Sequence, residues 1–213
     1  MIGQAIFALT FAAAIGSGLV AGIFFAFSSF VMAALGRLPS EHGIAAMNSI
    51  NVTVLNPVFM LAFLGTGALC VALAAASYFW WDGAGGKLIL IASVIYGAGC
   101  IGVTMLFNVP LNDALAAVRP GTPEAAALWS RYVAEWTTWN TVRTVAPLAS
   151  AILFTAALIS SLIAGPATGS RSRRRRCSEG RDPPGGALPA SPRGPCRDNC
   201  RPSSCASAES AVP

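Results

Sequence analysis

The sequence IGQAIFALTFAAAIGSGLVAGIFFAFSSFVMAAL, residues 2–35, contains no charged side chain. About 20 consecutive apolar residues are enough to cross the hydrocarbon of a bilayer as a helix. Three further segments are also uncharged and long enough to span: 54–79, 88–107 and 145–164. The sequence therefore predicts an all-α integral membrane protein, a four-transmembrane-helix bundle whose two ends lie on one side of the membrane. We expect it in the cell membrane.

The composition agrees with one membrane domain. Of the 213 residues, 54% are apolar, and the mean hydropathy is +0.62. The chain is too apolar for an ordinary soluble domain and too short for two membrane domains. The net charge of +5 is unevenly distributed, because residues 1–165 contain five basic and five acidic side chains whereas residues 166–213 contain nine arginines and four acidic side chains. We therefore divide the chain into a membrane domain, 1–165, and a tail, 166–213.

The tail consists mainly of Arg, Pro, Gly, Ser, Ala and Cys and has no apolar periodicity. Such a segment cannot bury a core, so it is predicted to be disordered. The arginines at 171 and 173–176 suggest an anchor for anionic lipid; alternatively, the tail is the translation of a GC-rich reading frame without a role of its own. No metal site is predicted, because no histidine and no paired short spacing accompany Cys196, Cys200 and Cys205.

The first apolar segment is predicted to be a retained helix and not a signal peptide. No basic residue precedes residues 2–35, and the segment is far longer than the roughly 7 to 15 apolar residues of a signal peptide. At about 1.5 Å per residue it would reach about 50 Å, so it must tilt, kink or protrude from the roughly 30 Å hydrocarbon layer. Gly18 and Gly22 have the small-xxx-small spacing that predicts close approach of a second helix.

Residues 122–143 are predicted to form an additional amphipathic helix at the membrane interface. Thr122, Pro123 and Glu124 are a helix start signal, with proline early and an acid in the first turn. Four side chains at i, i+4, i+8 and i+11 share one face of this helix: Tyr132, Trp136, Asn140 and Arg143.

Polar side chains stand at the ends of the apolar segments, where an unpaired amide or guanidinium is costly. They are Asn48, Asn51, Asn56, Asn108, Asn112, Asn140 and Arg143. One interpretation is a shared polar pocket that binds a substrate. The other is structural: asparagines cap helices and bridge them, an interfacial arginine pairs with an acid or a lipid phosphate, and the tryptophans form an interfacial belt.

Several motifs resemble those of the anthrone oxygenase-like family of integral membrane proteins. They are Ala21-Gly22-Ile-Phe24-Phe25-Ala-Phe27-Ser28, Met47-Asn48-x-x-Asn51, Asn108-Val-Pro110-Leu-Asn112 and Trp136-x-x-Trp139-Asn140-x-x-Arg143. The resemblance covers about residues 1–164 and leaves out the tail. It implies a four-helix membrane protein and the oxidation of an anthrone-type phenol to a quinone by O2 without a recognised cofactor.

Such an oxidation proceeds through the enolate, so its site must stabilise an oxyanion, exclude water and admit a flat apolar ring system. Preorganised donors of the kind required are the predicted catalytic residues Arg143, Asn140, Asn108, Asn112, Asn51 and Asn48. The predicted ring contacts are Trp136, Trp139, Tyr132, Phe24 and Phe27. His42, Glu135 and Asp113 are candidate bases, although a solvated surface position suits His42 equally well. No metal, flavin or haem motif is present in the sequence.

We therefore expect the partners to be the lipid bilayer, an apolar aromatic small molecule and O2, with no nucleic acid and no cofactor. The alternative is a non-catalytic membrane module that binds or passes a small amphiphile or assembles with a partner protein. A transporter is less favoured, because inverted repeats and broken helices are not evident.

Overall fold

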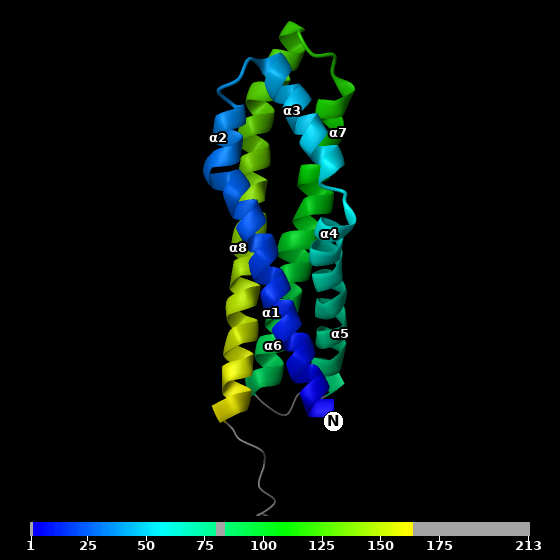
Figure 1. Cartoon of the computed structure of the whole chain (residues 1–213), viewed down its shortest axis with the longest axis vertical. Helices are drawn as coiled ribbons and strands as arrows, with labels where there is room; N and C mark the ends of the chain where they lie inside the picture. The colour runs from blue at the N-terminus through cyan, green and yellow to red at the C-terminus, as the bar shows by residue number, and fades with distance from the viewer. Residues whose placement is uncertain (1, 80–83, 164–213) are drawn as a thin grey trace, which may run out of the picture. The chain divides into compact units, whose positions relative to one another are not determined.

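The computed structural model describes residues 2–79 and 84–163, and these residues form helices without any strand (Figure 1). The predicted tail, 166–213, lies outside the described residues. Four helices are long and apolar enough to cross a membrane: 3–35, 57–79, 85–117 and 123–163. The predicted all-α bundle with four candidate membrane spans is therefore confirmed.

Three of the four spans contain short π-helical turns, labelled η. The first span consists of α1 (Ile2–Ala26), η1 (Phe27–Val31) and α2 (Met32–Leu35). The second consists of α4 (Pro57–Met60), η2 (Leu61–Gly65) and α5 (Thr66–Phe79), and the third of α6 (Ala84–Tyr96), η3 (Gly97–Gly102), η4 (Thr104–Asn108) and α7 (Val109–Ala117). The helix α3 (Ser40–Thr53) connects the first two spans. Figure 1 shows the start of α1 and the end of α8 (Pro123–Ile163) at the same end of the bundle.

The fourth span differs from the prediction in its extent. The sequence suggested a separate interfacial helix at 122–143 and a span at 145–164, but α8 is one continuous helix of 41 residues. No glycine or turn sequence interrupts it. Pro147 lies inside it and removes the N–H that would bond to the carbonyl of Arg143, but the helix continues beyond the proline. At about 1.5 Å per residue α8 is about 60 Å long, twice the hydrocarbon thickness, so part of it must extend beyond the bilayer.

Asn56 has the structural role that the capping interpretation proposed. Its Oδ1 accepts hydrogen bonds from the backbone N–H groups of Val58 at 3.1 Å and Phe59 at 3.0 Å. Pro57 follows in the first turn, where its missing N–H costs nothing. This cap fixes the start of the second span.

Close helix packing uses other glycines than the sequence suggested. A Cβ atom at Gly16 would overlap Thr66, and one at Gly99 would overlap Ala146. A Cβ atom at Gly18 or Gly22 would meet nothing within 4 Å. The prediction for Gly18 and Gly22 was therefore wrong, because spacing alone does not determine which face of a helix meets its neighbour.

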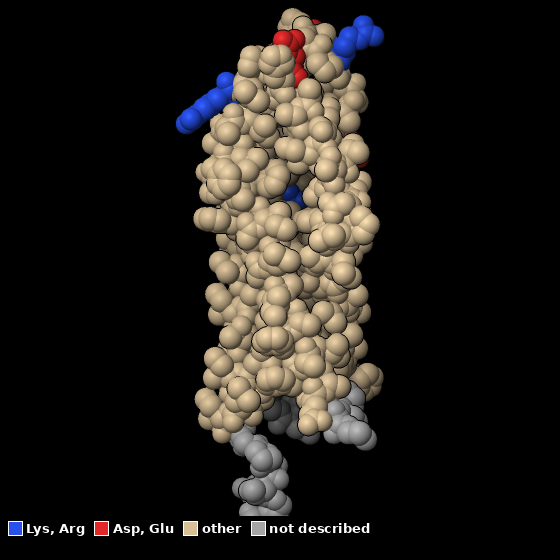
Figure 2. All heavy atoms as spheres, in the orientation of Figure 1, with Lys and Arg blue, Asp and Glu red and all other residues tan. Residues whose placement is uncertain are grey.

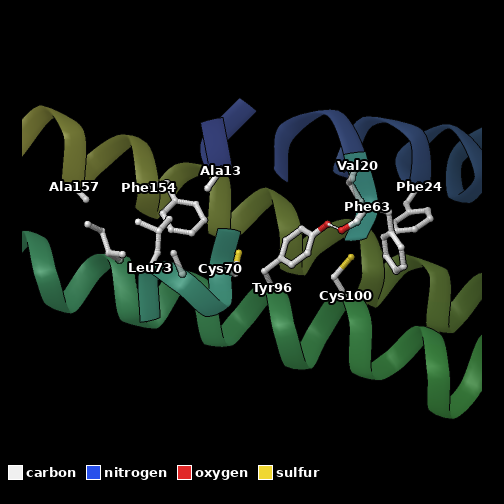
Figure 3. Close-up of a cluster of buried hydrophobic side chains, with 12 residues drawn as sticks. Ala13, Val20, Phe24, Phe63, Cys70, Leu73, Tyr96, Cys100, Phe154 and Ala157 are labelled. Carbon is white, nitrogen blue, oxygen red and sulfur yellow. Dashed lines mark hydrogen bonds between the residues drawn. The ribbon is translucent and has the colours of Figure 1, made fainter. Parts of the chain in front are cut away.

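Two apolar clusters fill the bundle, one toward each end. The first, which we call the inner cluster, includes Phe24, Phe63, Tyr96 and Phe154 from the four spans. Figure 3 shows this cluster, in which the Tyr96 hydroxyl donates to the Phe63 carbonyl at 2.9 Å. The second, the cap cluster, lies between α2, α3, α7 and α8 and consists of Met32, Ile44, Met47, Leu115, Ala125, Trp129, Tyr132 and Trp136. The candidate site lies where the two clusters meet.

Charged side chains mark the end of the bundle that carries α3. Figure 2 shows basic and acidic atoms around this end and an uninterrupted uncharged surface over most of the remaining length. Arg37, Glu41, Arg119 and Glu124 lie in or beside the connections at this end, and all four are exposed. Because charged groups avoid the hydrocarbon, this end of the bundle projects into the interface and the water beyond it.

Candidate functional site

Arg143 is buried in the middle of α8, with only 5% of its surface exposed. Its Nη2 donates to Asn140 Oδ1 at 2.8 Å and its Nη1 to Thr104 Oγ1 at 3.3 Å. The acidic residues of the described chain are all exposed, namely Glu41, Asp113, Glu124 and Glu135. The ion pairs found there join Glu41 to His42 and Glu135 to Arg131. Arg143 is therefore a buried cation without a carboxylate partner in this part of the chain, a state that costs several kcal/mol by order of magnitude.

Two aromatic rings partly offset this cost. The guanidinium carbon of Arg143 lies 4.4 Å from the centroid of Phe24 and 5.0 Å from that of Trp136. Each such contact contributes about 0.5 to 2 kcal/mol, more when water is excluded. Phe24 belongs to the inner cluster and Trp136 to the cap cluster. Phe27, half-buried on η1, approaches Trp136 with a centroid distance of 5.8 Å.

Asn140 holds the arginine and ties two spans together. Its Nδ2 donates to the carbonyl of Phe24 at 2.7 Å and to Ser28 Oγ at 2.8 Å, and its Oδ1 accepts from Arg143. Both Nδ2 hydrogens are engaged in these bonds, and Oδ1 is engaged with Arg143. The sequence placed Asn140 among the catalytic donors, whereas its contacts are those of a residue that positions Arg143.

Asn112 and Asn108 hold Trp136, the tryptophan beside Arg143. Asn112 Oδ1 accepts from Tyr132 Oη and from Trp136 Nε1, both at 2.8 Å. Asn108 is fully buried, and its Nδ2 donates to the carbonyl of Trp136 at 3.2 Å. Tyr132 in turn stacks between Trp129 and Trp136, with centroid distances of 5.7 and 6.2 Å. The ring system of Trp136 is therefore fixed in front of Arg143.

Two further predicted site residues lie on α3, which contributes to the cap cluster. Asn48 and Asn51 are half-buried and lie one turn apart on α3. Trp139 differs from the other predicted ring residues, because it stacks on Phe107 with a centroid distance of 3.6 Å.

Four buried polar atoms of the predicted catalytic residues have no hydrogen-bond partner among the described residues. They are two donors, Arg143 Nε and Asn51 Nδ2, and two acceptors, Asn108 Oδ1 and Asn48 Oδ1. Leaving one such group unsatisfied costs about 1 to 3 kcal/mol. Unpaired buried polar atoms of this kind indicate positions where water or a ligand supplies the missing partners.

The local helix geometry also points to this region. The π-helical turn η1 carries Phe27 and Ser28, and η4 carries Thr104 and Asn108. Such turns are uncommon and are frequently found at functional sites, because the extra residue shifts side chains out of the regular register. Here they belong to two different spans, and both pack against α8.

The candidate bases lie on the surface. His42, Glu135 and Asp113 are exposed, and Glu135 pairs with Arg131 at 3.7 Å. In residues 2–79 and 84–163 no group of three or more His, Cys, Asp or Glu side chains is arranged to hold a metal ion. The site is therefore built from a guanidinium, amides, hydroxyls and rings.

The sequence reading missed Thr104, which contacts the guanidinium. A signal for it exists, because Thr104 and Asn108 are polar side chains four residues apart near the end of an apolar segment and so share a helix face. Ser28 was quoted within a motif but not given a role.

Comparison with known proteins agrees with this picture of the membrane domain. The family model described as anthrone oxygenase matches residues 59–153, a segment that includes Asn108, Asn112, Trp136, Asn140 and Arg143. Neither a curated protein nor a solved structure matches the chain. The resemblance inferred from the motifs is confirmed over this segment: residues 59–153 of this multi-pass membrane protein match the anthrone oxygenase family model.

Proposed function

We propose that the protein uses O2 to oxidise a phenolic or anthrone-like small molecule to a quinone within the membrane, and that this membrane is the cell membrane. The supporting observation is the buried guanidinium of Arg143, which lacks a carboxylate partner among the described residues. A buried cation favours an anion beside it. Phenolates and enolates are the anions through which such substrates react with O2.

The proposed roles follow from the contacts of each side chain. Arg143 Nε and Asn51 Nδ2 donate to the substrate oxyanion, while the Oδ1 atoms of Asn108 and Asn48 accept from a second hydroxyl group. Phe24, Phe27 and Trp136 contact the ring system. The positions of these groups are held by Asn140, Asn112, Tyr132 and Thr104. Trp139 stacks on Phe107.

The overall change is balanced without a further reactant. A CH2 group of the substrate loses a proton to water, and the resulting enolate transfers an electron to O2. The two radicals combine, which forms a C–O bond and gives a peroxide. Breaking the O–O bond with loss of the remaining C–H proton gives the carbonyl and releases water. One oxygen atom enters the quinone and the other becomes water, while Arg143 stabilises the negative charge from the enolate onward.

Oxygen uptake by the protein in nanodiscs, with a panel of anthrones and hydroquinones, tests this function. We expect Arg143→Ala to lower the rate by about 100-fold or more, the usual effect of losing one oxyanion donor. Arg131→Ala is the matched control, because Arg131 is exposed on the same helix and its ion pair within the described residues is with the exposed Glu135. Equal rates in the wild type and Arg143→Ala would remove the catalytic assignment.

A non-catalytic membrane module that binds the same kind of molecule is the second candidate. It is favoured by the exposure of the candidate bases His42, Asp113 and Glu135, none of which is buried beside Arg143. For this alternative we expect the phenols to quench tryptophan fluorescence through Trp136, with dependence on Arg143, while no substrate of the panel causes oxygen uptake above that of empty nanodiscs.

A further inference from the structure

The depth of Arg143 in the membrane follows from the second span. That span, 57–79, has 23 residues, which is about 35 Å at 1.5 Å per residue and close to the hydrocarbon thickness. Its first residue, Pro57, therefore marks one interface. Phe24 lies beneath the guanidinium and meets Phe59 and Phe63 edge-on, with centroid distances of 6.3 and 6.2 Å. Because Phe59 and Phe63 follow Pro57 by only two and six residues, Arg143 lies nearer to this interface than to the other end of the span.

An opening on the side of the bundle leads to this depth. Figure 2 shows a hollow in the side of the molecule with basic atoms at its bottom, and the same position in Figure 1 lies between α1–η1 and the connection from α3 to α4. Among the basic side chains of the described residues, Arg143 is buried, with an exposed fraction of 5%, whereas Arg37, Lys87, Arg119 and Arg131 are exposed.

The aqueous end of the bundle offers no comparable route. The helix α3 covers that end, and its Ile44 and Met47 are fully buried in the cap cluster together with Leu115 and Tyr132. A molecule coming from the water along the bundle axis would have to displace this packing.

The elements on either side of the opening expose large apolar side chains. Phe25 and Phe30 on the first span are 60% and 62% exposed, and Val58 and Leu61 on the second are 80% and 75% exposed. Large apolar side chains exposed at this depth contact lipid. A ligand at Arg143 can thus keep an apolar part in the bilayer while its polar part reaches the guanidinium.

We propose that Arg143 binds the anionic head of an amphiphile that enters sideways from the bilayer, between α1–η1 and the α3–α4 connection, and whose apolar tail stays in the lipid. This inference rests on the proposed anion site at Arg143 but not on its oxidation chemistry. It narrows the ligand to a flat ring that bears an anionic oxygen, a phenolate or a carboxylate, and an alkyl substituent.

The test uses 4-alkoxybenzoates, which present a carboxylate on a flat ring and contain no phenol that could be oxidised. Binding of 4-methoxybenzoate, 4-octyloxybenzoate and 4-dodecyloxybenzoate to the full-length protein in nanodiscs is measured by titration calorimetry, with empty nanodiscs subtracted. Dissociation constants are expressed against total ligand. We expect the dodecyloxy compound to bind at least about 100-fold more tightly than the methoxy compound, because its chain is buried in lipid in the complex.

Arg143→Gln is expected to weaken binding of all three compounds by at least about 10-fold, whereas Arg131→Gln leaves it unchanged. A long-chain compound that binds no better than 4-methoxybenzoate would overturn entry from the bilayer, even where binding still depends on Arg143. Equal binding by the wild type and Arg143→Gln would overturn the anion site. Oxygen uptake with phenols is a separate measurement, so failure of the oxidation reaction is distinguishable from either result.

Discussion

The guanidinium of Arg143 lies above the ring of Phe24, 4.4 Å from its centroid, although 118 residues separate the two in the chain. The backbone of Phe24 takes part as well, because its carbonyl accepts from the same Asn140 whose Oδ1 binds Arg143. The first and fourth spans are thus joined at the point where the cation is held. Loss of any one of these three residues should therefore affect both the stability of the bundle and the position of the charge.

Replacing Asn140 tests this coupling. In Asn140→Ala, the Phe24 carbonyl and one Arg143 N–H lose their partners, so we expect a loss of about 2 to 4 kcal/mol in the free energy of unfolding. The Asn56→Ala variant removes only a helix cap and should lose about 1 kcal/mol. Unfolding in mixed micelles measures both. Equal losses would mean that Asn140 is no more than another local helix contact.

Adding a negative charge near Arg143 should lower its affinity for anions. In Asn112→Asp, the new carboxylate can still accept from Tyr132 and Trp136, and it supplies an acid close to the guanidinium. We expect 4-octyloxybenzoate to bind at least about 10-fold more weakly while the unfolding transition is retained. Unchanged affinity would indicate that the benzoate does not bind at Arg143.

A second substitution at Asn112 tests its hydrogen bonds without adding a charge. The Asn112→Leu variant removes the acceptor of both Tyr132 Oη and Trp136 Nε1. Two buried donors without partners should cost about 2 kcal/mol or more, together with a change in tryptophan emission as Trp136 loses its fixed position. Stability equal to that of the wild type would show that water replaces the amide oxygen.

The two tryptophans of the Trp136-x-x-Trp139 motif should differ in their effect on binding. Trp136→Phe replaces the indole beside Arg143 by a smaller ring and removes the bond to Asn112, and we expect about a 10-fold loss of affinity for 4-octyloxybenzoate. Trp139→Phe retains a ring that can stack on Phe107 and should have the smaller effect. Titration calorimetry of the two variants ranks them, and the reverse order would contradict the proposed ring contacts.

Two glycines on α1 provide a matched pair for the packing. A Cβ atom at Gly16 would overlap the buried Thr66, whereas one at Gly18 meets open space. Gly16→Ala should destabilise the bundle by about 1 to 3 kcal/mol, and Gly18→Ala should stabilise it by up to about 1 kcal/mol through helix propensity. Midpoints of thermal unfolding should therefore move in opposite directions.

Much of the fold was predictable from the sequence, because the length and hydropathy of a contiguous segment decide whether it spans a bilayer. The extent of α8 was not, since a polar segment followed by an apolar one looks like two elements while nothing in the chain forces a break between them. The close contacts at Gly16 and Gly99 were not predictable either, because many small residues are available and only the relative rotation of two helices selects among them.

For the site, the sequence by itself determined which residues of α8 share a face, since Tyr132, Trp136, Asn140 and Arg143 follow the helical repeat. Only the tertiary structure decided what that face meets: Phe24 and Ser28 from the first span, Thr104 and Asn108 from the third, and Phe107 as the partner of Trp139. The same packing left Arg143 without a carboxylate among the described residues. The physical reason is that periodicity fixes neighbours within one helix, whereas a pocket depends on the rotation, depth and π-helical turns of several helices packed together.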